Sequence, residues 1–459
     1  MDTAVGRGSG GGRRGRRIAL VVAVTCALFL VGGVGVLRSV RSAAPAPAPV
    51  GHSGQAVALD DQPVIASGTL ADAVASLQAR LKSLPGDWTS WAALGQAYVQ
   101  EARITADPTY YPKAEGALNR SLSVHPDGNF PALTGLGALA LARHDFAGAL
   151  AFGKRAEAIN PDNANIRGVE GDALIELGRY PEAFAELQKM VDLRPGLSSN
   201  ARVSYARELQ GDPHGAVAIM DMALNDASSA EDRAWVENQL GDLAFNSGDL
   251  GTAEEHYTRA QGFDPSFVPA RAGLAKVAVA RGHLDTAIDA YRNVVTVYPL
   301  PEYVIALIDL ETVTGHRADA DRQTGLLHVE EQLFRANGVN MDLEVALFDA
   351  DHGADLAQGL AAARAEWGRR QSIAVADALA WELYANSRYQ EALGYARQAL
   401  HLGTKNALFL FHRGMIERAL GRTAAARRDV QAALDVNPHF SILWSGWAAR
   451  TLASLKESR

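Results

Sequence analysis

The sequence is poor in the residues that hold small secreted domains and zinc proteins together. It has a single cysteine, Cys26, among 459 residues, which excludes a disulfide framework and a cysteine-based zinc site. Aromatic residues make up only 7% of the chain although hydrophobic residues make up 48%, so alanine supplies much of the apolar content. Alanine has the highest helix propensity and lets helices approach closely, so this composition favours close-packed helices.

Motifs for catalysis and for cofactor binding are missing as well. The sequence contains no Gly-x-Ser-x-Gly nucleophile elbow, no phosphate-binding Walker loop and no His-Glu-x-x-His zinc helix. The stretch from Asp349 to Leu360 resembles a calcium loop, but Gly353 is one place early and Leu360 stands where a bidentate glutamate is required. We therefore expect no cofactor, no metal and no catalytic residue, and we predict that the protein is not an enzyme.

Negative charge is almost absent from the first 41 residues, which carry seven arginines and one aspartate. Five of the arginines lie within 1–17 and precede residues 18–37, which contain no charge. Twenty helical residues span roughly 30 Å, the thickness of the hydrocarbon core of a membrane. The arginines before this span predict a transmembrane signal-anchor helix at 18–37, with a basic cytoplasmic segment at 1–17 and the rest of the chain outside the cytoplasm.

A cleaved signal peptide is the alternative, because Ala44, Ala46 and Ala48 offer small residues for a cleavage site. A proline follows each of them, and the apolar run is longer than a usual signal core, which favours the uncleaved anchor. The Ala-Pro run lies in an extended linker expected at 38–66. We therefore expect a single-pass protein of the cell membrane, and the composition suggests a bacterial source.

The body of the chain is acidic. The whole chain has a net charge of −8 and its first 41 residues carry +6, so residues 42–459 carry −14. Nucleic acid requires a positive protein surface, so we expect no nucleic acid partner. A negative surface favours neutral or basic partner segments.

Punctuating residues recur along the chain with a fixed spacing. A proline recurs at steps of 34, 70 and 34 residues, and 70 is two such steps plus an insertion of two residues. The prolines with this spacing are Pro161, Pro195, Pro265 and Pro299. Turn glycines follow the same frame at Gly178, Gly248 and Gly282. A 34-residue period with this punctuation resembles the tetratricopeptide repeat, in which each unit is a pair of antiparallel helices.

The resemblance implies an all-α fold, a right-handed helical solenoid of antiparallel helix pairs. We expect the solenoid at 88–438 with about eight to ten repeats, of which the segment 301–370 is degenerate. A capping helix is expected on each side, at 67–87 and at 439–459, because the terminal repeats of a solenoid need a polar outer face.

The resemblance also implies a scaffold that binds proteins or peptides and has no catalytic activity. Two alternatives stay open. The stretch from Gln78 to Val99 is similar to the start of the repeat domain in bacterial cytochrome c maturation subunits, which would imply an assembly factor that holds an apoprotein. The degenerate segment 301–370 is the one region with room for an enzymatic or regulatory site.

In a solenoid of this kind the first helix of each pair lines a concave groove, and its outward positions are free to bind a partner. The residues that the repeat frame places there, and that we predict to bind the partner, are Asp172, Glu176, Trp235, Asn238, Asp242, Lys276, Trp381, Tyr384 and Phe411. Tryptophan and tyrosine anchor interfaces, and the carboxylates favour a neutral or basic segment. The clamp with which members of this family hold a terminal carboxylate needs asparagine where Asp172 and Asp242 stand, so we expect no binding of that kind.

Overall fold

The computed structural model describes residues 70–457, and this part of the chain forms twenty-two α-helices and no strand. In chain order the helices are α2 Leu70–Ser83, α3 Trp88–Thr105, α4 Tyr110–Val124, α5 Phe130–Ala142, α6 Phe146–Glu157, α7 Ala164–Glu176, α8 Tyr180–Leu193, α9 Leu197–Leu209, α10 Pro213–Asp226, α11 Ala230–Asn246, α12 Leu250–Phe263, α13 Val268–Ala280, α14 Leu284–Val297, α15 Pro301–Val313, α16 Arg317–Ala336, α17 Asp342–His352, α18 Leu356–Arg369, α19 Ile373–Ala385, α20 Tyr389–Ala399, α21 Ala407–Ala419, α22 Thr423–Val436 and α23 Ser445–Glu457. The expected all-α fold is confirmed for this part of the chain.

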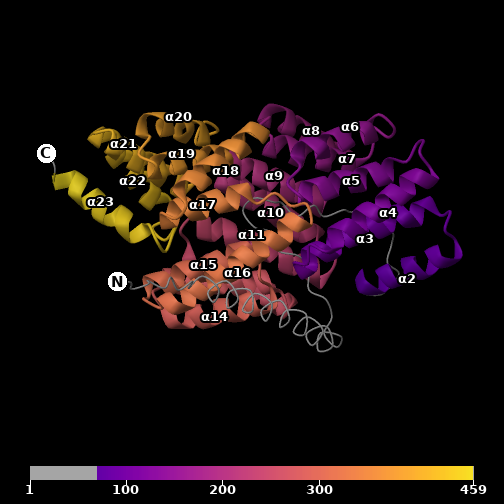
Figure 1. The fold of residues 1–459 in the computed structure, drawn as a ribbon, viewed down its shortest axis with the longest axis horizontal. Coiled ribbons are helices and arrows are strands. Elements are labelled where there is room, and N and C mark those ends of the chain that lie inside the picture. The colour runs from indigo at the N-terminus through magenta and orange to yellow at the C-terminus, as the bar shows by residue number, and fades with distance from the viewer. Residues whose placement is uncertain (1–69, 458–459) are drawn as a thin grey trace, which may run out of the picture. The chain divides into compact units, whose positions relative to one another are not determined.

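Consecutive helices pack in pairs. Helix α3 packs on α4, α5 on α6, and so on to α21 on α22, which gives ten pairs between Trp88 and Val436. We number them pairs 1 to 10 and call the two helices of each pair the A helix and the B helix. Helices α2 and α23 pack on α3 and α22 and so flank the ten pairs (Figure 1). The degenerate segment 301–370 folds as two ordinary pairs, α15 with α16 and α17 with α18.

Pair 5 shows how the repeat sequence produces a helix pair. The side chain of Ser229 accepts a hydrogen bond from the first turn of α11 and so caps that helix. The turn after α11 depends on Gly248, whose φ of +80° is the left-handed conformation that glycine adopts without steric cost. Asp249 then caps α12. Tyr257 of α12 packs on Gly241 of α11, where a Cβ atom would lie under 3.0 Å from the ring, so this glycine permits the close approach of the two helices.

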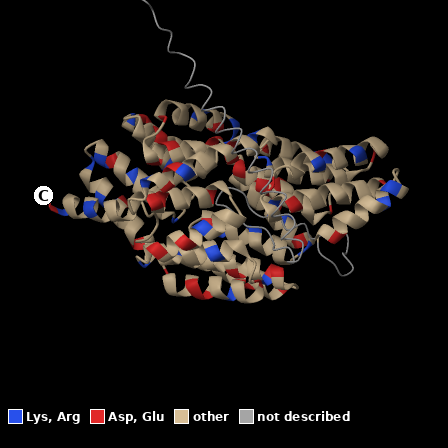
Figure 2. Cartoon of the chain, turned by 60° about the horizontal axis from the view of Figure 1, so that its bottom comes forward, with Lys and Arg blue, Asp and Glu red and all other residues tan. Residues whose placement is uncertain are grey.

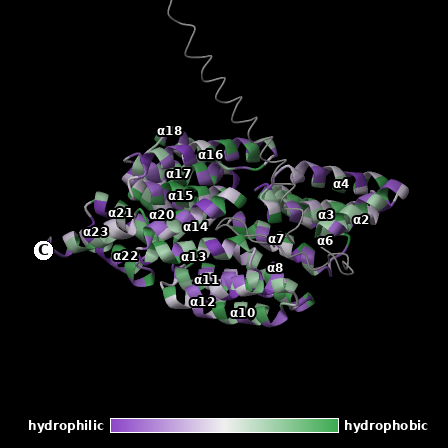
Figure 3. Cartoon of the chain, turned by 90° about the horizontal axis from the view of Figure 1, so that it is seen from below, coloured by the Kyte–Doolittle hydropathy of each residue, from purple (hydrophilic) through white to green (hydrophobic). Residues whose placement is uncertain are grey.

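Small side chains hold the pairs together. The alanine that recurs at one position of the B helix is fully buried in eight of the ten pairs. These alanines are Ala114, Ala149, Ala183, Ala216, Ala253, Ala287, Ala392 and Ala426. Hydrophobic and hydrophilic residues occur on every labelled helix (Figure 3), and charged residues of both signs are interspersed along the helices (Figure 2). The pairs are therefore amphipathic units that bury their apolar sides on their neighbours.

The chain returns to itself after five pairs. The turn between the A and B helices of one pair lies against the connection that follows the fifth pair after it, so that pair 1 meets the connection after pair 6. The residues bonded there are 192 to 196 apart in sequence. The bonded residues are Arg103 with Tyr298, His144 with Asn340, Glu176 with Arg370, Tyr180 with Ile373, and Phe245 with Asn437. At the turn of pair 4, Gly211 lies against the main chain of Gly403. Ten pairs allow five such contacts, and all five are present.

This return divides the ten pairs into two sets. We call pairs 1 to 5 (α3–α12) the first winding, pairs 6 to 10 (α13–α22) the second winding, and the line of five contacts between them the seam. At the middle of the seam, the connection between α18 and α19 lies against the turn between α7 and α8, where the Ile373 N–H donates a hydrogen bond to the hydroxyl oxygen of Tyr180 at 2.7 Å.

The expected location in the cell membrane is corrected by the structure. Between residues 70 and 457 no helix is both long enough and apolar enough to cross a bilayer. The span expected at 18–37 lies outside the described residues, together with the segments expected at 1–17 and 38–66. No location is therefore assigned to the protein.

Candidate partner-binding face

All nine residues predicted to bind a partner lie on A helices. Their helices are α7 for Asp172 and Glu176, α11 for Trp235, Asn238 and Asp242, α13 for Lys276, α19 for Trp381 and Tyr384, and α21 for Phe411. We call the surface of the A helices that carries these residues the A-helix face. The structure gathers the nine residues into three groups, one in the first winding, one where the two windings follow each other, and one near the C-terminus.

The central group surrounds the carboxylate of Asp242. It accepts hydrogen bonds from the Lys276 ammonium at 2.9 Å, the Tyr257 hydroxyl at 2.7 Å and the Asn238 amide at 3.1 Å. The Lys276 ammonium also lies over the ring of Phe245, 4.6 Å from its centroid. Burial and the nearby Asp242 hold the pKa of Tyr257 well above its usual range, so this phenol stays a hydrogen-bond donor. Three of the predicted residues thus form one network.

Carboxyl groups outnumber cations around this network. Burial, with Asp242 and Glu344 nearby, raises the pKa of Glu302 to about 7. Burial is also the main cause that raises the pKa of Glu208, and Asp242 adds to it. The sequence analysis missed Glu208 and Glu302, because they lie in the fourth repeat and the 301–370 segment, where the repeat frame is blurred. The acidic character extends over α9, α11, α15 and α17.

Asp172 and Glu176 are occupied by arginines of the chain itself. Arg202 donates from Nε and Nη2 to the Asp172 carboxylate at 3.0 Å, and both side chains are buried. Glu176 pairs with Arg370 of the second winding. Burial raises the pKa of both carboxyls, and the arginines oppose that effect. Neither arginine could be assigned to these carboxylates from the sequence, because Arg202 lies in the degenerate fourth repeat and Arg370 is a contact across the seam.

The third group forms an aromatic cluster that the C-terminal segment covers. The rings of Trp381 and Tyr384 stack with centroids 4.7 Å apart. Phe411 is fully buried, with Trp444 and Trp447 about 6 Å from it by ring centroids. The indole N–H groups of Trp381 and Trp444 both donate to one carboxylate oxygen of Asp351. The start of α23 therefore packs on the A-helix face of the last pairs.

Trp235 differs from these residues because it is only partly buried and its indole N–H has no hydrogen-bond partner among the described residues. It packs between the apolar clusters of α9–α11 and α11–α13. Asn238 is nearly fully buried, whereas the side chains of Asp242 and Lys276 are 21% and 30% exposed. The A-helix face is therefore partly accessible at Asp242 and Lys276.

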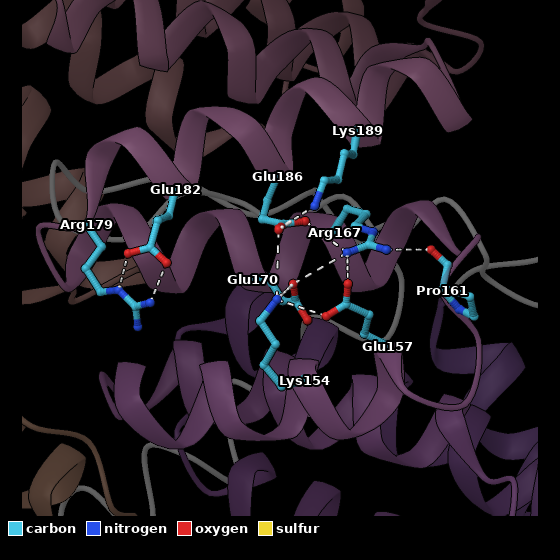
Figure 4. A network of polar contacts seen from close by, with 9 residues as sticks. All are labelled: Lys154, Glu157, Pro161, Arg167, Glu170, Arg179, Glu182, Glu186 and Lys189. Atoms are coloured by element: carbon cyan, nitrogen blue, oxygen red, sulfur yellow. Dashed lines mark hydrogen bonds and ion pairs between the residues drawn. The ribbon is translucent and has the colours of Figure 1, made fainter.

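A second cluster of carboxylates joins α6, α7 and α8. Oxygen atoms of Glu157, Glu170 and Glu186 lie within 4.8 Å of one another (Figure 4). The Lys154 ammonium donates to Glu170 at 2.8 Å and to Glu157 at 2.9 Å, and Arg167 donates to Glu186 at 3.0 Å. Although burial raises the pKa of Glu157, hydrogen bonds from Lys154 and Arg167 lower it to about 2. Side-chain cations already compensate these carboxylates, so we interpret the cluster as a structural network.

A surface pocket of about 240 Å³ lies on α10, α11 and α12. Leu224, Asn225, Arg233, Glu237 and Phe263 line it. None of the nine predicted residues lines this pocket, and we assign it no role.

Comparisons with known proteins bear on the architecture. Family models described as tetratricopeptide repeat match residues 140–208, 238–300 and 378–440. The chain contains tetratricopeptide repeats. The three matched stretches lie within the segment where the 34-residue period predicted such repeats. No curated protein matches the sequence.

Solved repeat structures are similar at low identity. A thermophilic TPR protein of Thermus thermophilus is 21% identical, over 37% of this chain and 92% of its own, with a TM-score of 0.35. The type IV pilus biogenesis factor PilW is 20% identical, over 48% and 98% of the two chains, with a TM-score of 0.36. The APC/C hetero-tetramer Cut9–Hcn1 is 15% identical, over 84% and 81%, with a TM-score of 0.38. Similarity at this level carries no argument about how the pairs wind or what they bind.

Proposed function

We propose that this protein is a non-catalytic scaffold whose A-helix face binds a protein or peptide segment of neutral or basic character. Proteins built from stacked helix repeats typically bind other proteins, and they use the extended surface that the stacked pairs create. The proposal applies this general property to the A helices of both windings and to the nine predicted residues on them.

One observation carries the choice of a basic segment, namely the excess of carboxyl groups around Asp242. Glu208, Glu302 and Glu344 lie in the same neighbourhood, and Lys276 is the cation that donates to Asp242. A lysine or arginine of a partner would add positive charge where carboxyl groups are in excess, which favours association electrostatically. Trp235 adds a partly exposed aromatic ring, a residue type that anchors interfaces.

Short labelled peptides that are basic, neutral or acidic test the proposal directly. We expect the basic peptide to bind more tightly than the acidic one, and Asp242→Asn to weaken the basic peptide alone. Asp162→Asn removes the same charge at an exposed loop position and should leave binding unchanged. Equal binding of basic and acidic peptides, or equal effects of the two substitutions, would contradict the proposal.

The pH dependence gives an independent check. A bound cation favours the ionised form of Glu302, whose pKa is about 7, so binding expels a proton when the pH is near 7. The affinity for the basic peptide should therefore rise as the pH is raised from 6 to 8, and Glu302→Gln should remove that rise.

Three expectations stay predictions. They are the right-handed sense of the solenoid, the assembly-factor alternative and the alternative site at 301–370. No contact in the described residues favours either of the two alternatives.

A further inference from the structure

The seam differs in kind from the interfaces inside each winding. All helices that pack extensively on each other are neighbours in the chain or one helix apart, so the contacts across the seam come from turns and connections. Most of them involve main-chain groups. The Asn340 N–H donates to the Arg143 carbonyl at 3.1 Å, and the Asn437 side-chain amide donates to the Phe245 carbonyl at 2.9 Å. Water can replace each such partner when the contact opens.

Apolar contact across the seam reaches two core clusters of the first winding. Phe334, Val339 and Met341 pack on the cluster of α3–α5, with Leu300 and Val345 beside them. Ile373 packs on the cluster of α7–α9, with Leu402 and Phe409 beside it. By contrast, every pair inside a winding buries a continuous set of alanines and larger apolar residues. The seam therefore lacks such a continuous apolar layer.

Arg370 joins the two windings at the middle of the seam. It pairs with Glu366 of its own winding and with Glu176 of the first winding, and its guanidinium lies over the Phe146 ring, 4.6 Å from the centroid. Arg370 and Glu366 are almost completely buried. One side chain thus connects two carboxylates and an aromatic ring that belong to both sides of the seam.

The seam also covers part of the A-helix face. Glu176, one of the nine predicted residues, is held by Arg370 across the seam. Asp172 is instead covered by Arg202 of its own winding, and Trp381 and Phe411 are covered by the C-terminal segment. A partner could therefore not reach the Glu176 carboxylate while the windings stay together.

We propose that the seam is a gate: the second winding separates from the first along its five contacts, and this movement uncovers the part of the A-helix face around Glu176 for a partner. The inference rests on the proposed function, because the gate controls access to the face that we propose as the binding surface. The helix pairs stay intact during the movement, because no extensive helix packing crosses the seam. The structure described here is the closed form.

The test measures a distance across the seam in the full chain. Spin labels are attached at Arg179→Cys and Gln371→Cys, two exposed positions on opposite sides of the seam, after Cys26→Ser has removed the native thiol. A second labelled pair at Arg388→Cys and Arg422→Cys reports on neighbouring turns of one winding. The gate predicts that breaking the seam lengthens and broadens the first distance and leaves the second unchanged.

Two substitutions break the seam at different strengths. Arg370→Gln removes the shared cation, and Asn437→Asp replaces the donor to the Phe245 carbonyl by a carboxylate oxygen while keeping the acceptor for the His439 N–H. Arg413→Gln is the matched control, because Arg413 pairs with Asp429 inside pair 10. We expect the seam distance to lengthen in both seam variants, more in Arg370→Gln, and to match the parent in the control.

A labelled short oligolysine peptide then reports on the uncovered face. Its affinity should rise severalfold in Arg370→Gln and Asn437→Asp, but not in Arg413→Gln, which removes the same charge elsewhere. An unchanged seam distance in the milder Asn437→Asp variant and in folded Arg370→Gln would overturn the gate. Separation of the windings without a gain in peptide binding would support the gate and count against the proposed function, so the two failures are distinguishable.

Discussion

The turns of the two windings have the same backbone and different surroundings. Gly178 and Gly211 in the first winding and Gly282 and Gly421 in the second all have φ between +73° and +80°. A Cβ atom at Gly178 or Gly211 would lie under 3.0 Å from main-chain atoms of the second winding, whereas nothing lies within 4 Å of one at Gly282 or Gly421. The same glycine therefore makes a turn in both windings, and at Gly178 and Gly211 it also makes room for a second segment of the chain.

Buried carboxyl groups separate the two windings as well. In the first winding Glu157 is held by Lys154 and Arg167, and its pKa is lowered to about 2. In the second winding burial and the neighbouring Asp349 and Asp351 raise the pKa of Glu382 to about 8. Cations thus keep Glu157 of the first winding ionised, whereas Glu382 of the second winding is a neutral acid near neutral pH. Substitutions at the seam, at these carboxyl groups and at the turns should therefore change the stability of the protein in ways that test the difference between the two windings.

The largest effect is expected from Arg370→Gln, which leaves Glu176 and Glu366 without their shared cation. Removing one partner of a buried ion pair costs about 3–5 kcal/mol of unfolding free energy. Urea denaturation followed by circular dichroism measures it. Arg413→Gln breaks an ion pair that is partly exposed and lies within one pair, so its cost should be about 1 kcal/mol. Equal losses of unfolding free energy in the two variants would show that the ion pairs of the seam contribute no more to stability than an ion pair within one helix pair.

The pH dependence of stability should have opposite signs at Glu382 and Glu157. Because the pKa of Glu382 is raised from 4.5 to about 8, the folded state keeps a proton that the unfolded state releases in this window. Its contribution to stability therefore falls as the pH rises from 4.5 to 8, by about 1.4 kcal/mol per pH unit at most. Glu382→Gln should remove this fall and stabilise the protein at pH 8.

Glu157 should behave in the reverse way. Its pKa is lowered from 4.5 to about 2, so its contribution is present above pH 4.5 and is lost as the pH falls towards 2. Glu157→Gln should therefore destabilise the protein at pH 7 and have little effect at the lowest pH at which the fold survives. Unfolding midpoints of both variants and the parent, measured across this range, check the two signs. The same sign for both variants would contradict the contrast.

Matched glycine substitutions separate the stability cost of disturbing the seam from the cost of disturbing the turn conformation. Gly211→Ala and Gly282→Ala both place a side chain at positive φ, which costs about 1–2 kcal/mol. Gly211→Ala in addition pushes a methyl group onto the carbonyl of Gly403, and overpacking of this kind costs a further 1–3 kcal/mol, roughly. The difference between the two unfolding free energies, about 2 kcal/mol, is the part due to the seam. A difference near zero would mean that the contact with Gly403 accommodates the added methyl group without loss of stability.

The smallest effect is expected at two turns that have a residue other than glycine at positive φ. His144 and Ser387 occupy the same turn position and have φ of +60° and +59°. Ser387→Gly relieves that strain and should raise the unfolding free energy by roughly 1 kcal/mol. His144→Gly relieves it too but loses the hydrogen bond from Nδ1 to the Asn340 carbonyl, 2.7 Å away, so its net effect should be near zero. A gain as large as that of Ser387→Gly would show that this hydrogen bond contributes nothing.

The sequence predicted the parts of the fold that depend on local signals. The position of Gly248 in the turn, of Asp249 at the cap and of Ala253 in the buried contact all follow from the 34-residue frame, because each acts within one pair. The seam could not be predicted in this way. Its contacts join residues 192 to 196 apart, and the residues that make them, such as Tyr298 and Asn437, are ordinary members of the repeat.

The same limit applies to the candidate site. The nine residues selected from the frame lie on A helices, and two of them, Asn238 and Lys276, contact Asp242. It could not show that Arg202 and Arg370 hold Asp172 and Glu176, because the register between helices of different pairs is a tertiary property. The burial of Trp381 and Phe411 was missed for the same reason, since the aromatic residues that cover them follow the last repeat.

The contact between each pair and the connection five pairs later has a consequence for how this chain can change in length. Repeat proteins ordinarily gain or lose a unit at small cost, because each unit meets only its neighbours. Deleting pair 5 or pair 6 here would remove one contact of the seam and move the other four out of step by a whole unit, so that Tyr180 would face the wrong connection and Arg370 the wrong carboxylate. The repeats are interchangeable in sequence pattern, yet their number is fixed by the contacts between the two windings.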